Sequence, residues 1–151
     1  MSTVSAAGYP HAAGVLFAND GLDLYVNTQR SSRKARNVAA NGRAAVVVPV
    51  RKFPVGPAFE VHFQASAVVL AADDPRIVEL AERGVLKAIT GHGELDDPDT
   101  CFLGLRPTGR IHSYGIGAPI LGVARDPLHV GAGMVDLHSD EFTDPRARPS
   151  R

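Results

Sequence analysis

The chain has 151 residues, 44% of them hydrophobic and 21% charged, which is the composition of one globular domain rather than of a disordered protein. Its 16 basic residues balance its 16 acidic residues, so no overall field would draw the protein to nucleic acid or to a membrane surface. The single cysteine, Cys101, excludes an internal disulfide framework and a metal site built from several cysteines, and it fits a reducing compartment.

Residues 1–8 contain neither a basic leader nor an apolar stretch long enough for export. No run elsewhere approaches the roughly 18 apolar residues that cross a membrane. We therefore expect a soluble, cytoplasmic protein.

Short apolar segments separated by turn signals fill the first part of the chain and predict a β-rich domain. Residues 12–18 are an apolar run of strand length, and Asn19-Asp20-Gly21 after it predicts a hairpin turn, because these residue types tolerate positive φ. Residues 22–27 alternate, which predicts a second strand with Leu22, Leu24 and Val26 on one face.

A helix is predicted next. Ser31 or Ser32 is placed to cap a helix that runs to about Asn41, and Gly42 stands where a left-handed C-terminal cap is needed. The β-branched run over residues 44–50 predicts the strand that follows.

The second part of the chain begins with the clearest alternation, residues 59–70, which predicts a long strand with one wet or ligand-facing side. Asp73 or Asp74 is placed to cap a second helix over residues 75–83, and residues 91–100 predict an exposed acidic loop. Further strands are predicted at residues 101–105, 110–114, 120–124 and 129–130. We expect one domain over residues 1–137, a β-barrel or sandwich with short helices, and a flexible tail over residues 138–151.

Charge is distributed unevenly. Residues 24–59 contain seven basic residues and no acidic one, and four of these cations, Arg30, Arg33, Lys34 and Arg36, fall close together. Arg33 and Lys34 lie in the first turn of the predicted helix, where the backbone dipole makes a cation unfavourable by about 0.3–1 kcal/mol. A bound anion would reverse that sign, because backbone N–H groups, serine hydroxyls and both cations would converge on it. The alternative is that both cations point into solvent.

Two segments resemble a known family. Residues 24–38 (LYVNTQRSSRKARNV), followed by residues 41–48 (NGRAAVVV), resemble the signature of the pyridoxamine 5′-phosphate oxidase-like FMN-binding split barrels. In that family Ser-Arg-Lys opens a helix whose N-terminus holds the FMN phosphate. Residues 8–17 (GYPHAAGVLF) are similar to the family's second strand, whose backbone lies along the flavin ring. The similarity covers about residues 1–70, and the rest mostly by strand order.

The resemblance implies a split β-barrel in which residues 27–37 hold the cofactor phosphate. Arg33 and Lys34 would neutralise the phosphate, Ser32 would donate a hydroxyl, and Asn27 and Thr28 would contact the ribityl chain or the ring. Phe17 belongs to the segment similar to the strand whose backbone lies along the flavin ring. Glu60 falls where the oxidase has a glutamine that touches the cofactor. The family's cofactor lies between two subunits, which implies a homodimer.

The chain also departs from the family. Members usually have a helix before the first strand, which leaves open whether the native chain starts upstream of Met1. Arg110-Ile111-His112 has the Arg-x-His spacing of the oxidase's substrate motif and would place both side chains on one strand face, but Ser113 and Tyr114 replace the charged pair that follows in the oxidase. An ordinary strand with a polar face is the alternative.

Other classes of site have weaker sequence support. The six histidines include no pair at i, i+4, so we expect no metal site, and the basic segment has too few aromatic residues to predict nucleic-acid binding. Gly115-Ile-Gly is half of a dinucleotide fingerprint and is better explained as a turn. No Gly-x-Ser-x-Gly motif is present, and Cys101 is better explained as a buried small hydrophobe than as a nucleophile.

We therefore predict a flavin-dependent oxidoreductase that binds FMN at a dimer interface and transfers hydride or electrons to an unidentified small molecule, with no catalytic side chain that the sequence identifies. One alternative is a deazaflavin coenzyme, for whose longer anionic tail Arg30, Arg36, Arg51 and Lys52 would form a groove. Another is a non-catalytic protein that binds flavin or haem, with His62 as the haem ligand and His112 behind it.

Overall fold

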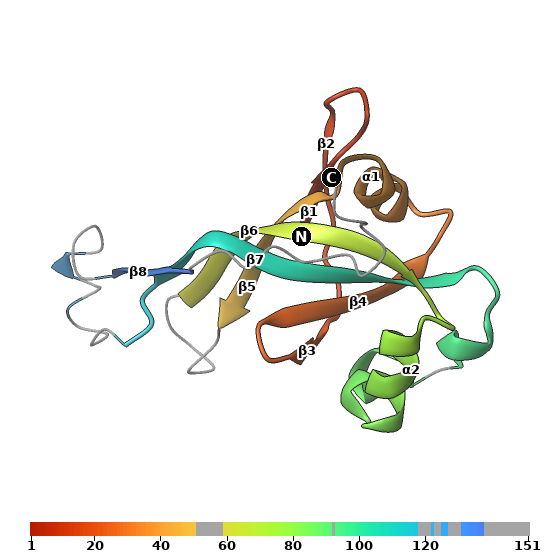
Figure 1. Ribbon diagram of the computed structural model, residues 1–151. Coiled ribbons are helices and arrows are strands. Elements are labelled where there is room, and N and C mark those ends of the chain that lie inside the picture. The colour runs from red at the N-terminus through yellow and green to blue at the C-terminus, as the bar shows by residue number, and fades with distance from the viewer. Residues whose placement is uncertain (51–58, 92, 118–121, 123–124, 127–130, 138–151) are drawn as a thin grey trace, which may run out of the picture.

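The computed structural model describes residues 1–50, 59–91, 93–117, 122, 125–126 and 131–137. Eight strands, two α-helices and two 3₁₀ turns follow one another along the described chain (Figure 1). They are β1 (Ser2–Val4), β2 (Pro10–Ala12), β3 (Ala18–Asp20), β4 (Asp23–Gln29), α1 (Arg33–Asn41), β5 (Arg43–Val50), β6 (Phe59–Ala71), α2 (Pro75–Glu82), η1 (Val85–Ile89), η2 (Glu94–Asp96), β7 (Thr100–Tyr114) and β8 (Ala132–Asp136).

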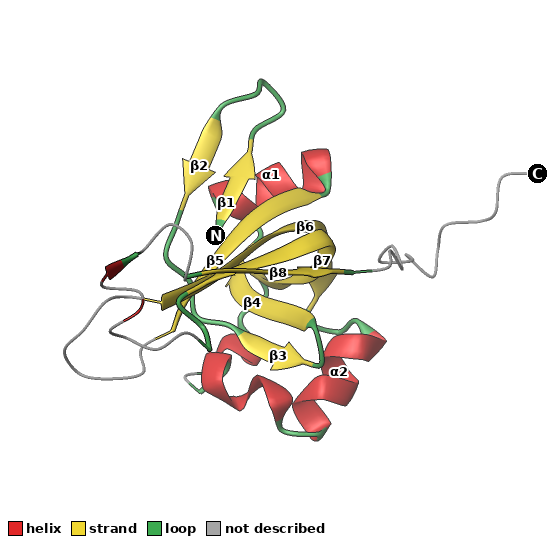
Figure 2. Cartoon of the chain, turned by 90° about the vertical axis from the view of Figure 1, so that its left-hand side faces the viewer, coloured by secondary structure: helices red, strands yellow, loops and turns green. Residues whose placement is uncertain are grey.

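All eight strands form one sheet of order β2-β1-β5-β6-β7-β4-β3, with β8 paired to β7, and every pairing is antiparallel. The long strands β6 and β7 run through its centre and curve together (Figure 1). Figure 2 shows α1 at one end beside β1 and β2, and α2 at the opposite end beside β3 and β4. The predicted mainly β fold is thus confirmed.

One hydrophobic core lies between the strands and α1. It is built from the alternate residues of the central strands, such as Val26, Phe63 and Leu103, and α1 adds Ala35 and Val38. The apolar stripe of α1 is narrow, so the helix contributes only small side chains to this core. The alternation of β4, β5 and β6 places these residues together because side chains of a strand point to opposite faces in turn.

A second core lies on the other face of β4. Tyr25 is 3% exposed there and packs with Phe102 of β7 and with Ile77 and Leu86 of the helical segment. Both faces of β4 are therefore covered. Leu24 and Val26 face the first core, and α2 and η1 pack against the opposite face, which carries Tyr25. The 3₁₀ turn η1 was not predicted from the sequence.

The predicted strand over residues 12–18 is wrong. β2 ends at Ala12 and β3 begins at Ala18, while the intervening residues form no strand and Leu16 is 76% exposed. The physical reason is pairing: the ladder with β1 ends where the Ala13 N–H donates to the Met1 carbonyl, at 3.0 Å. An apolar run alone does not make a strand without a hydrogen-bonding partner.

The β3–β4 hairpin is present, but its turn lies slightly later than predicted. Asn19 and Asp20 belong to β3, and the two-residue loop is Gly21-Leu22. Gly21 has a φ of 60°, so the residue that tolerates positive φ occupies the first loop position.

The strands predicted at residues 101–105 and 110–114 are one continuous strand, β7. The turn signals between them mark a bulge, since the register with β6 shifts between Phe63 and Gln64 and Gly109 has a φ of 69°. The strand β8 was not predicted. The strand predicted at residues 120–124 lies outside the described residues except for Gly122, and residues 129–130 and 138–151 lie outside them entirely.

Candidate functional site

The start of α1 has the predicted caps. Ser32 takes an extended conformation, and its Oγ accepts a hydrogen bond from the Ala35 N–H at 3.2 Å. Gly42 ends the helix with a φ of 63°, and its N–H donates to the Val38 carbonyl. The first turn carries no acidic residue, so the positive end of the helix dipole has no counter-charge within the turn.

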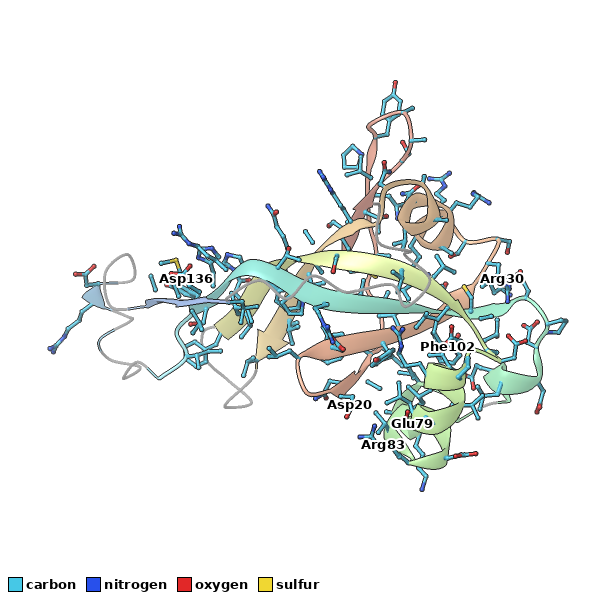
Figure 3. The ribbon with its side chains drawn as sticks, viewed as in Figure 1. Asp20, Arg30, Glu79, Arg83, Phe102 and Asp136 are labelled. Carbon is cyan, nitrogen blue, oxygen red and sulfur yellow. The ribbon has the colours of Figure 1, made fainter. Side chains whose placement is uncertain are left out.

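The turn that leads into α1 is fastened to the start of β7. The Arg30 N–H donates to the Asp99 carbonyl at 2.8 Å, and the Ser31 hydroxyl donates to the Asp99 carboxylate at 2.8 Å. Figure 3 places Arg30 at this end of the sheet, where β4 ends and β7 begins. The Arg36 guanidinium turns back to the Ser31 carbonyl, at 2.5 Å. These hydrogen bonds hold the turn that leads into α1.

Thr28 supports Ser32 from beneath. Thr28 is 9% exposed, and its hydroxyl donates to Ser32 Oγ at 3.1 Å. Ser32 Oγ therefore accepts two hydrogen bonds, from Thr28 and from the backbone of α1. Its own proton remains available to an acceptor.

A cavity of about 320 Å³, here called the clamp cavity, opens beside this turn. Its lining residues are 14–16, Asn27, Lys34, Ala88, Ile89 and Glu94. One N–H of the Asn27 side-chain amide donates to the Ile89 carbonyl at 3.1 Å, which leaves the second N–H and Oδ1 as groups for a ligand. The lining residues that the structure describes thus combine a cation, a carboxylate, a side-chain amide and an apolar wall. Such a combination suits an amphipathic ligand with an anionic end.

The predicted site residues do not all share this cavity. Asn27 and Lys34 line it. Phe17 does not, although the residue before it in the chain, Leu16, does; Phe17 is 38% exposed. Arg33 lines a different cavity of about 340 Å³ on the side of the β1–β2 hairpin, with Arg36 and His11. Consecutive helical residues differ by about 100° in direction, which accounts for the separation of Arg33 from Lys34.

Glu60 lies in a third cavity, here called the histidine cavity, of about 710 Å³ on β5, β6 and β7. His62 and His112 are direct cross-strand neighbours there, and their rings stack with centroids 5.2 Å apart. Glu60 Oε1 approaches His62 Nδ1 to 3.4 Å without forming a hydrogen bond to it. Arg110 lines the same cavity as His112, as the Arg-x-His spacing predicted, and pairs with Asp136 at 2.8 Å.

The sequence did not identify Glu94 or the η1 residues as part of a site. Glu94 was included in the acidic loop, and nothing in the sequence separates it from its acidic neighbours. Arg51 and Lys52, predicted for a tail groove, lie outside the described residues. Cys101 is fully buried, and burial raises the pKa of its thiol, which keeps it protonated and agrees with a packing role.

The sequence matches the family described as pyridoxamine 5′-phosphate oxidase over residues 1–111. The chain belongs to this family. Its solved relatives within the pyridoxamine 5′-phosphate oxidase-like fold confirm the split-barrel prediction, and the alignment with the haem storage protein HutZ from Vibrio cholerae has 20% identity and a TM-score of 0.61, covering 73% of this chain and 80% of that one.

Two further structures of this pyridoxamine 5′-phosphate oxidase-like fold are similar. A haem-binding protein from Mycobacterium smegmatis is 20% identical with a TM-score of 0.63, over 76% of this chain but 47% of that longer one. A putative pyridoxamine 5′-phosphate oxidase from Listeria innocua is 23% identical with a TM-score of 0.54, over 73% of this chain and 82% of that one. Comparison with curated protein sequences finds no match. None of the described helices is long and apolar enough to span a membrane.

Proposed function

We propose that this protein is a cytoplasmic, flavin-dependent oxidoreductase that holds FMN, or a related deazaflavin coenzyme, with its phosphate at the N-terminus of α1. The observation that carries the proposal is the pairing of Lys34 with an acid-free, serine-capped helix start on the wall of the clamp cavity. Membership of the pyridoxamine 5′-phosphate oxidase family supports the choice of cofactor.

The residues present fit a phosphate. The first N–H groups of α1 have no intrahelical acceptor, and the Ser32 hydroxyl proton and the Lys34 ammonium group would add a hydroxyl donor and a cation. A cation that costs about 0.3–1 kcal/mol at a helix start becomes favourable once an anion binds beside it. Each charge-assisted contact would then contribute about 1.5–3 kcal/mol.

The other walls fit the rest of such a cofactor. Val15, Leu16 and Ile89 supply apolar surface for a ring, and the Asn27 Oδ1 can accept from a hydroxylated chain. The flavin itself would supply hydride or electron transfer to a small-molecule substrate. The protein residues would bind and orient it and exclude water from the ring, and none of them need act as an acid or base.

We include a homodimer in this proposal. Glu60 and Lys34 line different cavities of one chain, and the family resemblance puts the cofactor between two subunits. A second copy that presents its histidine cavity to the clamp cavity would bring both residues to one ligand. It would also cover exposed apolar side chains such as Leu16, Phe17 and Val47.

Haem binding is the second candidate. His62 lies on the wall of the histidine cavity, where Val47 and Phe63 also line the space, and its ring stacks on His112. Two solved proteins of the same fold are described as haem proteins. A histidine imidazole can ligate haem iron.

The visible absorption spectrum of the purified protein tests both candidates, followed by titration with FMN, with the deazaflavin and with haem. Bound FMN or deazaflavin supports the first proposal. A Soret band that is lost in His62→Ala supports the second. Binding of none of the three refutes both.

A further inference from the structure

The cavity of about 340 Å³ on the side of the β1–β2 hairpin, here called the hairpin cavity, collects cations that the described chain does not neutralise. Arg33 and Arg36 both line it, since residues three apart in a helix share a face. Neither forms an ion pair with a described residue, and Arg36 donates to the uncharged Ser31 carbonyl. None of the described lining residues is acidic. Two neighbouring cations of this kind repel each other unless an anion lies between them.

Uncharged and half-buried polar groups line the same cavity. Asn37 is 8% exposed, and one N–H of its amide donates to Thr3 Oγ1 at 3.0 Å, which leaves the second N–H for a ligand. His11 lies directly opposite Thr3 in the β1–β2 ladder, so its side chain is on the face of the hairpin that Asn37 contacts. His11 Nδ1 is buried without a hydrogen-bond partner. Because no protein group holds this nitrogen, the ring can turn toward an acceptor that a ligand brings.

The hairpin side of the cavity is aromatic and apolar. Tyr9 is 74% exposed, although its backbone N–H is held by Ser5 Oγ at 3.0 Å, and Pro10 lines the cavity next to it. Figure 1 shows this hairpin standing beside α1, so the tyrosine and the cationic helix face flank one space. An exposed aromatic ring beside paired cations fits a ligand that is anionic at one end and flat and apolar at the other.

We propose that the hairpin cavity is a second ligand site that binds a small aromatic carboxylate. A guanidinium group pairs with a carboxylate through two parallel hydrogen bonds, so Arg33 and Arg36 would hold the anionic end. Asn37 and His11 would add polar contacts, and Tyr9 would cover the ring of the ligand. The site does not depend on flavin or haem binding, because the hairpin cavity shares no lining residue with the clamp cavity or the histidine cavity.

Two-dimensional NMR titration with benzoate tests the site, since it detects weak binding and locates it. Benzoate should shift the amide signals of residues 5–11 and 33–37, and it should bind more tightly than acetate, which lacks the ring, or benzamide, which lacks the charge. Arg36→Gln should weaken benzoate binding about tenfold or more, because a charge-assisted pair is lost. Tyr9→Ala should lower the affinity for benzoate to that for acetate and leave acetate binding unchanged.

Arg43→Gln is the matched control, because Arg43 is an exposed arginine that follows α1 without lining the cavity. Equal losses in Arg36→Gln and Arg43→Gln, or equal binding of benzoate and benzamide, would overturn the carboxylate site. Unchanged benzoate binding in Tyr9→Ala would overturn the aromatic part of the proposal. Direct displacement of benzoate by FMN would show that the hairpin cavity belongs to the cofactor site, which also overturns a separate site. Failure of the protein to bind FMN would affect the proposed function alone, since the benzoate titration needs no cofactor.

Discussion

Replacing Lys34 by alanine separates the phosphate clamp from the rest of the site. Lys34 lines the clamp cavity beside Asn27, so its ammonium group would make one charge-assisted contact with the phosphate. Such a contact contributes about 1.5–3 kcal/mol, which corresponds to a loss of roughly 10–150-fold in FMN affinity. Riboflavin, which has no phosphate, should bind Lys34→Ala about as well as the wild type.

Arg33→Ala provides the comparison within the same turn. Arg33 lines the cavity on the β1–β2 hairpin side, so we expect a smaller loss of FMN affinity than for Lys34→Ala. Without ligand, both variants should unfold at equal or higher urea concentration, because removing a cation from the first turn relieves about 0.3–1 kcal/mol of unfavourable dipole interaction. Lys87→Ala, an exposed cation of η1, serves as the control for a general loss of positive charge.

Fluorescence titration of FMN and riboflavin at two salt concentrations measures these effects. Equal losses for FMN and riboflavin in Lys34→Ala would show that Lys34 does not bind the phosphate. A loss in Arg33→Ala as large as that in Lys34→Ala would show that both cations reach the same anion, contrary to their separate cavities.

Three further predictions concern the scaffold. Ser32→Ala removes the helix cap and should lower the free energy of unfolding by about 1 kcal/mol, as measured by urea denaturation. Gly115→Ala should be severely destabilising, by about 1–3 kcal/mol or more, because its φ is 73° and the new methyl group would clash with the buried Phe59 ring; a melting temperature close to that of the wild type would contradict this. Hydrogen bonding to Arg83 lowers the pKa of the Asp20 carboxyl in the folded protein (Figure 3). The ion pair therefore stabilises the fold at pH values above 3.8, the ordinary pKa of this carboxyl. This stabilisation is lost as the pH falls through the lower pKa of Asp20 in the folded state. Arg83→Gln should therefore raise the Asp20 pKa in an NMR titration, and an unchanged value would refute the ion pair.

Features set by local chemistry were predictable from the sequence. The serine cap and the glycine end of α1 are fixed by neighbouring residues, and the alternation of β6 depends only on which face is buried. The Asp74 cap and proline start of α2 are local in the same sense.

Features set by pairing between distant segments were not predictable. Residues 12–18 have a strand's composition but lose their partner after Ala13, and the turn signals inside β7 proved to be a bulge because β6 pairs across them. Glu94 reaches the clamp cavity only because η2 follows the helical segment that covers β4. The divergence of Arg33 from Lys34 could have been anticipated, since adjacent helical positions point in different directions.

The hydrogen bonds of Asp99 join two segments that the sequence keeps far apart. Asp99 holds the turn before α1 through Arg30 and Ser31, and its own N–H donates to the Asp97 carboxylate in the segment that carries Glu94. Asp99 therefore links the turn before Lys34 to the segment just after Glu94. A ligand that stabilises one of these two segments should slow amide hydrogen exchange in the other. A substitution at Asp99 would change the local stability of both segments without any contact to the ligand.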